Sequence, residues 1–347
     1  MQPRAPEAAD VDARPSVAVF GAYGHTARFV VAELVRRGHV PILCGRDAGK
    51  LAALAAEWPA LPRRVATVSD PASLDEALQG VAAVINCAGP FLDTSGPLVE
   101  AAVRAGIHYL DLSAEQRAVQ DVFERHAAAA VEAGSVVLPA MAFYGALADL
   151  LATVAVGDWT DMDAIEVGVA LDSWQPTLGT RVTGVRNHYR RLVVADGALA
   201  PLPDPPPHRE WSFAAPFGGQ PMVAMPFSEV ITLSRHLPAR TIEAYINTRA
   251  LQDVRDPDTP MPVASDDSGR SAQRFAMGVQ VRRDGEVRRA EASGQDIYAV
   301  SAPLVVEAVE RVLAGEVRGP GVLAAGAAFD AAGFLAALSP HFDIRIH

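Results

Sequence analysis

Residues 16–46 read SVAVFGAYGHTARFVVAELVRRGHVPILCGR, and this stretch decides the fold of the chain. It contains an apolar strand, a turn with two glycines, an amphipathic helix and a second apolar strand. That order is typical of the βαβ unit that binds dinucleotides, in which the glycine turn joins the first strand to the helix.

The glycine loop predicts a site for a pyrophosphate. Gly21 supplies the tight turn after the strand, and Gly24 lets the backbone approach the phosphate closely. The helix that begins near His25 offers free N–H groups and the positive end of its dipole, so we expect His25 to face phosphate or solvent. The loop residues expected to contact the cofactor are Gly21, Tyr23, Gly24, His25 and Thr26.

The end of the second strand selects the cofactor. Chains that bind NAD usually place an Asp or Glu there for the ribose 2′-OH, whereas this chain has Gly45 and Arg46, followed by Lys50. A guanidinium and an ammonium suit a 2′-phosphate, so the sequence predicts NADP(H) rather than NAD(H). The alternative for Arg46 is a solvated loop charge. We also assign Asp70, after the third expected strand, to the cofactor site.

Lys50 is the only lysine of the chain, and this excludes several chemistries. Schiff-base catalysis, a Walker-type phosphate loop and a Tyr-x-x-x-Lys pair all need a lysine. Lys50 belongs to the adenosine side of the expected site. A proton must therefore come from His, Tyr, an acid, a cysteine or water.

Length and composition indicate a globular protein of two domains. The chain has 347 residues, of which 50% are hydrophobic, and a formal net charge of −11, which argues against a nucleic-acid partner. No apolar run is long enough to predict a membrane span. Residues 1–15 lack the features of a targeting peptide, so we expect a disordered tail and a cytoplasmic location.

Two cysteines, Cys44 and Cys87, fall inside expected buried strands, where a free cysteine behaves as a small hydrophobe. We expect neither a disulfide nor a metal site. Cys87 keeps an alternative role because it would lie beside the nicotinamide.

Alternating strands and helices over residues 16–144 predict an α/β, Rossmann-type, doubly wound parallel sheet. Helices are expected at 97–105 and 116–132. Residues 145–295 have hairpin-like strands and form an inserted mixed α+β domain. In the C-terminal segment, 296–347, a helix at 302–313 returns to the first domain.

The glycine loop with Gly45 and Arg46 and five further segments resemble the saccharopine dehydrogenase-like oxidoreductases, a group that includes bacterial trans-acting enoyl reductases. The further segments are 86–91 (NCAGPF), 108–115 (HYLDLSAE), 294–298 (GQDIY), 319–323 (GPGVL) and 329–338. The resemblance implies a nicotinamide fold with an inserted mixed sheet and a reaction in the cleft between them. It implies that Gly89 and Pro90, after Cys87 and Ala88, lie beside the nicotinamide, and that the pocket edge follows Ser113.

The chain departs from the family pattern at residues 142–149 (AFYGALAD), where members often have a Gly-Phe-Asp-Ser-x-Pro-Ser-Asp run. Asp149 is kept, but Tyr144 replaces the earlier acid, which makes saccharopine itself a doubtful substrate. Because Tyr144 follows the last parallel strand at its carboxyl end, we predict that it donates the proton. The alternative is a tyrosine that packs at the domain junction.

Three functions remain open. The first is an NADPH-dependent reductase that transfers hydride to a C=C or C=N bond of a small metabolite. The second is a catalytically silent NADP(H)-binding protein that senses redox state or supports a partner, and the third is a C–N bond-forming amino acid dehydrogenase. A homodimer through the second domain is expected.

Two further groups of residues in the second domain could line the cleft. Arg186 and Arg190 are expected one turn apart on a single helix, where they could hold a carboxylate or phosphate. Glu229, Arg235 and His236 could likewise face the substrate, or could pair across a sheet.

Overall fold

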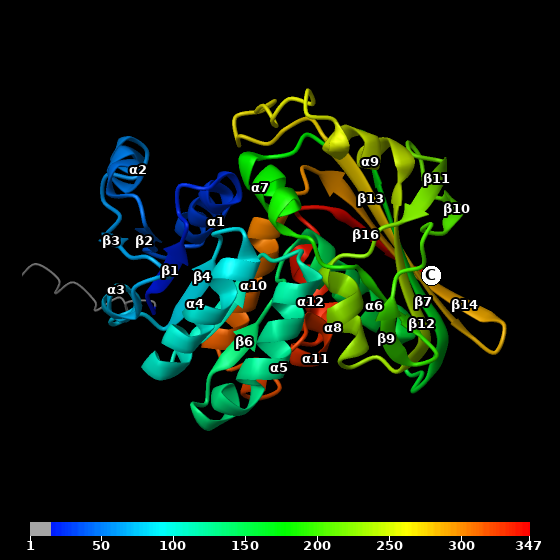
Figure 1. The fold of residues 1–347 in the computed structure, drawn as a ribbon, viewed down its shortest axis with the longest axis horizontal. Helices are drawn as coiled ribbons and strands as arrows, with labels where there is room; N and C mark the ends of the chain where they lie inside the picture. The colour runs from blue at the N-terminus through cyan, green and yellow to red at the C-terminus, as the bar shows by residue number, and fades with distance from the viewer. Residues whose placement is uncertain (1–14) are drawn as a thin grey trace, which may run out of the picture.

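The structure is a computed structural model that describes residues 15–347, so nearly all of the expected N-terminal tail lies outside the described residues. The chain forms two β-sheets with helices packed around and between them (Figure 1). The first sheet contains the N-terminal strands of the described chain and lies at one end of the molecule. The second sheet has long twisted strands and lies at the opposite end.

Within residues 15–347, the first sheet has seven strands in the order β15-β6-β5-β4-β1-β2-β3, and all its neighbouring strands are parallel. The strands are β1 (Val17–Phe20), β2 (Ile42–Gly45), β3 (Arg63–Val65), β4 (Ala83–Asn86), β5 (His108–Asp111), β6 (Val136–Leu138) and β15 (Gly321–Val322). The predicted doubly wound parallel sheet is confirmed. The additional edge strand, β15, comes from the C-terminal part of the chain.

Helices cover both faces of this sheet because its strands are apolar on both sides. In β1, Val17 and Val19 belong to the core shared with α1 (His25–Arg36) and α10 (Ser301–Leu313). Ala18 and Phe20 belong to the opposite core. The helices on that second side are α3 (Pro71–Ala77), α4 (Phe91–Ala105) and α5 (Gln116–Glu132), while α2 (Ala48–Ala53) and the short turn η1 (Leu54–Ala56) lie at the β2–β3 edge.

Helix α4 begins at Phe91, six residues earlier than the predicted start at 97. The Glu115 carboxylate accepts hydrogen bonds from the backbone N–H groups of Phe91 (2.7 Å) and Leu92 (3.2 Å). These are free donors at a helix N-terminus, and a carboxylate there also suits the helix dipole. The helix therefore starts where a residue 24 positions away caps it.

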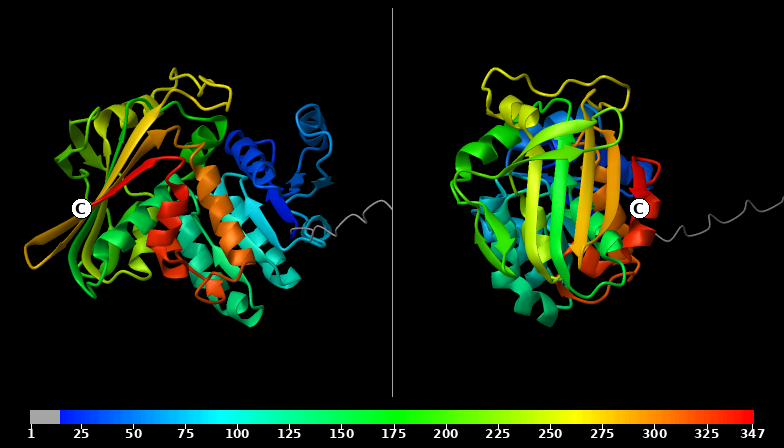
Figure 2. Two further views of the ribbon diagram at one scale, coloured as in Figure 1. Left: turned by 180° about the vertical axis from the view of Figure 1, so that it is seen from behind. Right: turned by 90° about the vertical axis from the view of Figure 1, so that its right-hand side faces the viewer.

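The second sheet has nine strands in the described chain, with the main path β10-β11-β12-β7-β13-β14-β16. Only β7 and β12 pair in parallel; the other pairs are antiparallel. Its strands are β7 (Met162–Leu171), β8 (Leu192–Ala195), β9 (Ala198–Pro201), β10 (His208–Ser212), β11 (Gly219–Ala224), β12 (Ala239–Asn247), β13 (Arg274–Arg283), β14 (Glu286–Gln295) and β16 (Asp343–Ile346). The predicted mixed second sheet is confirmed, and Figure 2 shows its long strands side by side with helices behind them.

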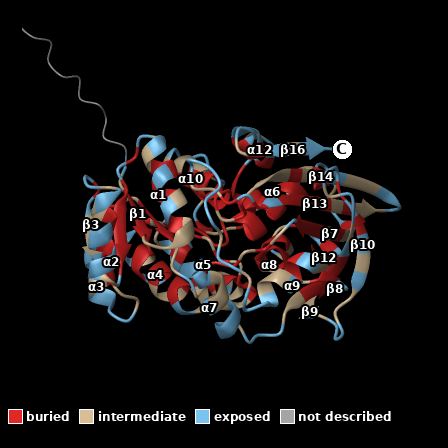
Figure 3. Cartoon of the chain, turned by 90° about the horizontal axis from the view of Figure 1, so that it is seen from above, coloured by how far each residue is buried: buried red, intermediate tan, exposed pale blue. Residues whose placement is uncertain are grey.

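The inner face of the second sheet packs against helices that separate the two sheets. The π-helical turn η2 (Phe143–Leu147) leads into α6 (Ala148–Val156), which contacts β13 and β14. Helix α8 (Ser228–Ser234) contacts β12 on one side and α5 of the first sheet on the other. The remaining helices are α7 (Leu178–Arg186), α9 (Thr248–Arg255), α11 (Ala325–Ala328) and α12 (Ala331–Leu338). Buried residues run continuously through this central layer (Figure 3).

The C-terminal segment, 296–347, was expected to pack on the first domain, and the structure divides it between the two sheets. Helix α10 packs against α1, and β15 pairs with β6. However, β16 pairs with β14 and so extends the second sheet. The expectation fails for this strand because its backbone partner lies on an edge strand whose position the local sequence does not reveal.

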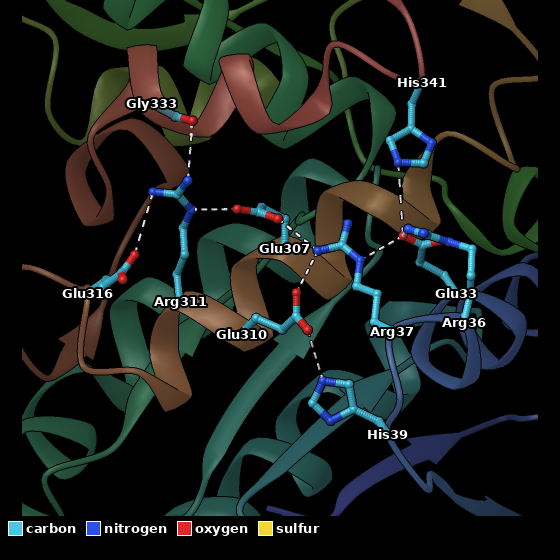
Figure 4. A network of polar contacts seen from close by, with 10 residues as sticks. All are labelled: Glu33, Arg36, Arg37, His39, Glu307, Glu310, Arg311, Glu316, Gly333 and His341. Atoms are coloured by element: carbon cyan, nitrogen blue, oxygen red, sulfur yellow. Dashed lines mark hydrogen bonds and ion pairs between the residues drawn. The ribbon is translucent and has the colours of Figure 1, made fainter. Parts of the chain in front are cut away.

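Helices α1 and α10 are joined by a network of ion pairs (Figure 4). The Arg37 guanidinium donates to Glu33 (2.7 Å) on α1 and to Glu307 (2.7 Å) and Glu310 (2.6 Å) on α10. The outer members of the network are Arg36, His39, Arg311, Glu316 and His341. The C-terminal part of the chain is thereby fixed to the glycine-loop helix at its far end from the loop.

Candidate active site at the carboxyl edge of the first sheet

All predicted cofactor residues follow the carboxyl ends of parallel strands. Because parallel strands end at one edge of a sheet, the loops after β1, β2, β3, β4 and β5 lie along the same edge. Tyr144 belongs to η2, which follows β6 at that edge. The sheet therefore places the predicted site residues along one side of the molecule.

The glycine loop leaves room for backbone but not for side chains. Gly21 has φ of 80°, and a Cβ there would lie 2.8 Å from the Ala88 Cβ and 2.9 Å from its backbone N. Gly24 is the N-cap of α1 and contributes no side chain to it. The first N–H groups of α1 are thus left to a ligand, with Thr26 in the first turn. This geometry fits a pyrophosphate.

The two cations expected after β2, Arg46 and Lys50, differ in their contacts. A Cβ on Gly45 would lie 2.7 Å from the Tyr23 ring, so Gly45 lets this ring pack on the strand end. The Lys50 ammonium lies 5.6 Å from the centre of the same ring and 4.0 Å from Asp47. Arg46 is exposed and has no hydrogen bond or ion pair within residues 15–347. Arg46 is therefore the cation that is free to meet a 2′-phosphate.

Asp70 has a structural task in the described chain. Its carboxylate accepts from the backbone N–H of Ala72 (3.1 Å) and caps α3. The side chain is exposed at the β3 end of the edge.

Hydrogen bonds made by the Asn86 side chain hold the loop after β4 in place. The Asn86 amide donates to Thr94 (3.1 Å) and to the Tyr109 hydroxyl (3.1 Å), and its oxygen accepts from the Ala88 N–H (3.0 Å). Gly89 is exposed and is followed by Pro90 at the N-cap of α4. Burial raises the pKa of the Cys87 thiol, which disfavours a thiolate there. The Cys87 side chain is partly buried and packs against the core of the first sheet.

Buried Asp111 and its partner Ser113 organise the loop after β5. The Asp111 carboxylate accepts from Tyr109 (2.8 Å), the Ser113 N–H (2.9 Å) and the Ala140 N–H (2.8 Å). Ser113 is itself buried, and its hydroxyl accepts from the Glu115 N–H (3.1 Å). The Ser113 side chain is thus used inside the loop.

Tyr144 lies in an aromatic cluster between the two sheets. Its ring stacks on Phe227 with centroids 4.2 Å apart and lies 6.0 Å from Trp174. The side chain is 9% exposed, yet its hydroxyl has no hydrogen-bond partner among the described residues. A buried polar atom without a partner is costly, and such atoms in native proteins call for an explanation, which a ligand can provide.

Glu229 and Arg191 adjoin Tyr144. The Glu229 Oε1 accepts from the Phe227 N–H (2.8 Å), while its Oε2 is buried without a partner in residues 15–347. The Arg191 guanidinium stacks over Phe227 at 4.7 Å and donates to the Pro226 carbonyl. Burial raises the pKa of Glu229 to about 7, although hydrogen bonds from the backbone and the charge of Arg191 oppose the shift.

Tyr298 connects this cluster to the glycine loop. Its hydroxyl bonds to Trp174 Nε1 (3.1 Å) and Thr180 (3.0 Å), and its ring lies 5.5 Å from the ring of His25. Burial lowers the pKa of His25, whose Nε2 is also buried and unpartnered within the described chain. The phosphate end and the Tyr144 end of the edge are therefore continuous through Tyr298.

Helix α7 covers the loop after β4. A Cβ on Gly89 would lie 3.3 Å from the Thr183 hydroxyl, and Arg186 pairs with Asp93 of α4 at 2.9 Å. The prediction that Arg186 and Arg190 share one helix is wrong, because α7 ends at Arg186 and Arg190 instead donates to the Leu202 carbonyl. The two guanidinium groups have different partners and form no shared anion site.

Glu229, Arg235 and His236 also separate. The His236 Nε2 pairs with Asp149 Oδ1 (3.0 Å), and Arg235 lies 4.0 Å from Glu124. Only Glu229 joins the Tyr144 cluster.

Residues 15–347 contain no group of three or more His, Cys, Asp or Glu that could hold a metal ion. In the same residues, no helix is both long and apolar enough to cross a membrane.

The fold and the glycine loop define a Rossmann-type dinucleotide-binding protein with an inserted mixed sheet. Residues 17–138 match the family model described as the saccharopine dehydrogenase NADP binding domain. Over this range the chain is similar to the saccharopine dehydrogenase-like oxidoreductases, and the predicted NADP(H) cofactor agrees with the description of the matched domain.

Known relatives agree with this placement. The chain is 30% identical over 150 residues to the saccharopine dehydrogenase-like oxidoreductase of Bos taurus, covering 38% of this chain and 35% of the relative. It is 27% identical over 143 residues to the trans-acting enoyl reductase of Mycobacterium ulcerans, covering 39% and 34%. The chain thus spans about a third of the length of these relatives.

A solved structure matches over nearly the whole chain. Saccharopine dehydrogenase (L-Glu forming) from Saccharomyces cerevisiae, in its apo form, aligns with a TM-score of 0.68, covering 96% of this chain and 100% of that one, at 12% identity. At this identity the similarity shows that the two proteins share a fold.

Proposed function

We propose that this protein is an NADPH-dependent oxidoreductase that transfers hydride to a C=C or C=N bond of a small metabolite. One observation carries the proposal: a loop shaped for pyrophosphate shares its sheet edge with a buried cluster in which the Tyr144 hydroxyl and Glu229 Oε2 have no partner among the described residues. Buried polar atoms without a partner are costly, and a substrate bound at this cluster would supply the missing partners. Bound NADPH supplies the hydride.

In this proposal the protein binds and orients. Gly21, Gly24 and the first turn of α1 hold the pyrophosphate, and Arg46 holds the 2′-phosphate. Gly89 and Pro90 lie beside the nicotinamide, and Tyr144 faces the substrate. A homodimer through the second domain and a cytoplasmic location remain predictions.

Titration with NADPH and NADH tests the cofactor assignment. We expect the unaltered protein to prefer NADPH, and Arg46→Ala to weaken NADPH binding by about 10- to 100-fold with little change for NADH, because a charge-assisted contact is lost. Arg125→Ala is the control, since Arg125 is an exposed arginine on α5 away from the loop. Equal affinity of the unaltered protein for both cofactors would contradict the assignment.

A further inference from the structure

Glu229 and Tyr144 at the proposed site are each held in place, while one polar atom of each has no partner within residues 15–347. The Phe227 N–H fixes Glu229 Oε1 and leaves Oε2 buried and unpartnered within residues 15–347. The Phe227 ring in turn stacks on Tyr144, whose hydroxyl is also unpartnered. Phe227 therefore positions both groups from a single residue.

The two groups differ in how readily they exchange a proton near neutral pH. Burial and the nearby charges of Tyr298 and Glu229 raise the pKa of Tyr144 well above its ordinary value, so the phenol keeps its proton. Burial raises the pKa of Glu229 only to about 7. A general acid works best when its pKa is near the working pH, which favours the carboxyl over the phenol.

We propose that Glu229 is the acid–base residue of the site and that Tyr144 donates a hydrogen bond to the substrate without giving up its proton. The inference rests on the proposed function and revises the role predicted for Tyr144. Glu229 comes from α8, Tyr144 from η2 and Arg191 from the segment before β8, so three separate elements build the pair and its cation.

Hydride from NADPH adds to one atom of the C=C or C=N bond, and the π electron pair moves to the other atom. That atom takes the proton of the Glu229 carboxylic acid, leaving a carboxylate and NADP⁺. The carboxylate then takes up one proton from the solvent, so that each reduction consumes one NADPH and one H⁺. In the oxidative direction, the carboxylate accepts the proton.

The charged and titratable groups around Glu229 set the sign of the pH dependence. Arg191 favours its carboxylate, and Arg191 in turn lies within electrostatic reach of Tyr144 and of Arg255 on α9. Because reduction needs protonated Glu229, kcat/KM should be constant at low pH and fall as pH rises through about 7. Oxidation with NADP⁺ needs the Glu229 carboxylate, so its kcat/KM should rise as pH increases through about 7.

The first experiment measures NADPH oxidation against pH, with cyclohexenone as the C=C probe and pyrroline as the C=N probe. Glu229→Gln should lower kcat/KM by about a hundredfold or more and abolish the limb near neutral pH, since glutamine keeps the acceptor for Phe227 but carries no acidic proton. Tyr144→Phe should lower turnover by about a hundredfold and keep the limb. Both variants should bind NADPH as the unaltered protein does.

The matched control is Glu243→Gln, because Glu243 also has a tyrosine neighbour, Tyr245 (2.9 Å), but on β12 in the second sheet. It should leave the profile unchanged. A neutral limb that survives in Glu229→Gln would overturn the proposal, as would a limb that disappears only in Tyr144→Phe.

A second experiment needs no turnover. Infrared difference spectra between about pH 5 and about pH 9 should show a protonated carboxyl that titrates near pH 7 and is absent from Glu229→Gln. A Glu229 that stays ionised throughout would overturn the inference. If the protein binds NADPH but reduces neither probe, the proposed reaction fails for these bonds, and the spectra alone decide the protonation of Glu229.

Discussion

The α1–α10 network and the Tyr144–Glu229 cluster are both rich in partly buried polar groups, but only the first pairs its charges. In the network, every acid faces at least one arginine or histidine, and Arg37 alone contacts three glutamates (Figure 4). In the cluster, Tyr144 and Glu229 each keep an atom without a partner among the described residues. We expect the first arrangement to serve stability, and the proposed function assigns the second to binding or chemistry.

The pKa of a buried glutamate is lowered in the network and raised in the cluster. Burial alone raises the pKa of Glu33, but hydrogen bonds from Arg36 and Arg37 outweigh it and lower the pKa to about 2. Burial also raises the pKa of Glu229, and there the single nearby cation does not compensate. Perturbed acids of the second kind are the ones typical of functional sites.

Breaking the paired region should have the largest effect on stability. Arg37→Met leaves Glu33, Glu307 and Glu310 close together without their shared cation, and it should lower the free energy of unfolding by about 2 to 4 kcal/mol. The loss is limited because Arg36, Arg311 and His39 still partner these acids. Urea denaturation monitored by circular dichroism measures it.

Urea denaturation should also distinguish a variant of the network from a variant of the cluster. Glu229→Gln should not lower the free energy of unfolding and should raise it at neutral pH, because glutamine replaces an acid whose ionisation burial disfavours. NADPH affinity should be unchanged in Arg37→Met. An equal loss of stability in the two variants would show that the distinction between paired and unpaired regions has no energetic basis.

The sequence predicted the parts of the fold that depend on local pattern. The glycine loop, the parallel strands and α5 (Gln116–Glu132) were predicted from local pattern, and so were the hairpin-like strands of residues 145–295, which include the hairpins β8–β9 and β13–β14. The start of α4 and the pairing of β16 were missed because a distant carboxylate and an edge strand decide them. Such contacts leave no signal within the segment itself.

The candidate site was only partly visible in the sequence for the same reason. Gly21, Gly24 and Arg46 follow a spaced motif, so they could be identified before the fold. Phe227 and Arg191, in contrast, come from loops with no motif, and Phe227 meets Tyr144 where α8 packs against η2. Glu229 carried a signal as an acid in an otherwise apolar stretch, but its partners did not.

The buried pair of His236 and Asp149 offers a smaller test, based on pH. Burial alone lowers the pKa of His236, but the charge of Asp149 and the hydrogen bond to it outweigh burial and raise the pKa above the ordinary 6.5. The stabilisation is therefore fully present below pH 6.5 and is lost as pH rises through the folded-state pKa.

We expect the free energy of unfolding to fall as pH rises above about 6.5, and His236→Gln to reduce this fall. Glu229 acts in the same direction between its ordinary pKa of 4.5 and about 7, so the difference between the two proteins is the readout. His188→Gln, at an exposed histidine, is the control. Identical pH dependence in the unaltered protein and His236→Gln would exclude the pair as a source of stability.

The smallest expected effect concerns the Arg186–Asp93 pair, which is an exposed ion pair beside the proposed site. No residue of α7 is buried, and the helix exposes Leu178, Val182 and Val185. Its N-terminal end is instead held by Tyr298 through Thr180 (3.0 Å), so its two ends are fixed by contacts of unequal strength. Exposed ion pairs contribute little to stability because solvent and salt screen them.

Arg186→Ala should therefore leave the urea midpoint unchanged and increase hydrogen exchange of the amides near the end of α7 by about twofold. Tyr298→Phe removes the hydroxyl that bonds to Trp174 and Thr180, and it should increase exchange at the start of α7 by more than that. Exchange measured by mass spectrometry on peptides spanning residues 178–187 compares the two. A larger effect from Arg186→Ala than from Tyr298→Phe would mean that the surface pair, rather than the buried hydroxyl, holds α7 over Gly89.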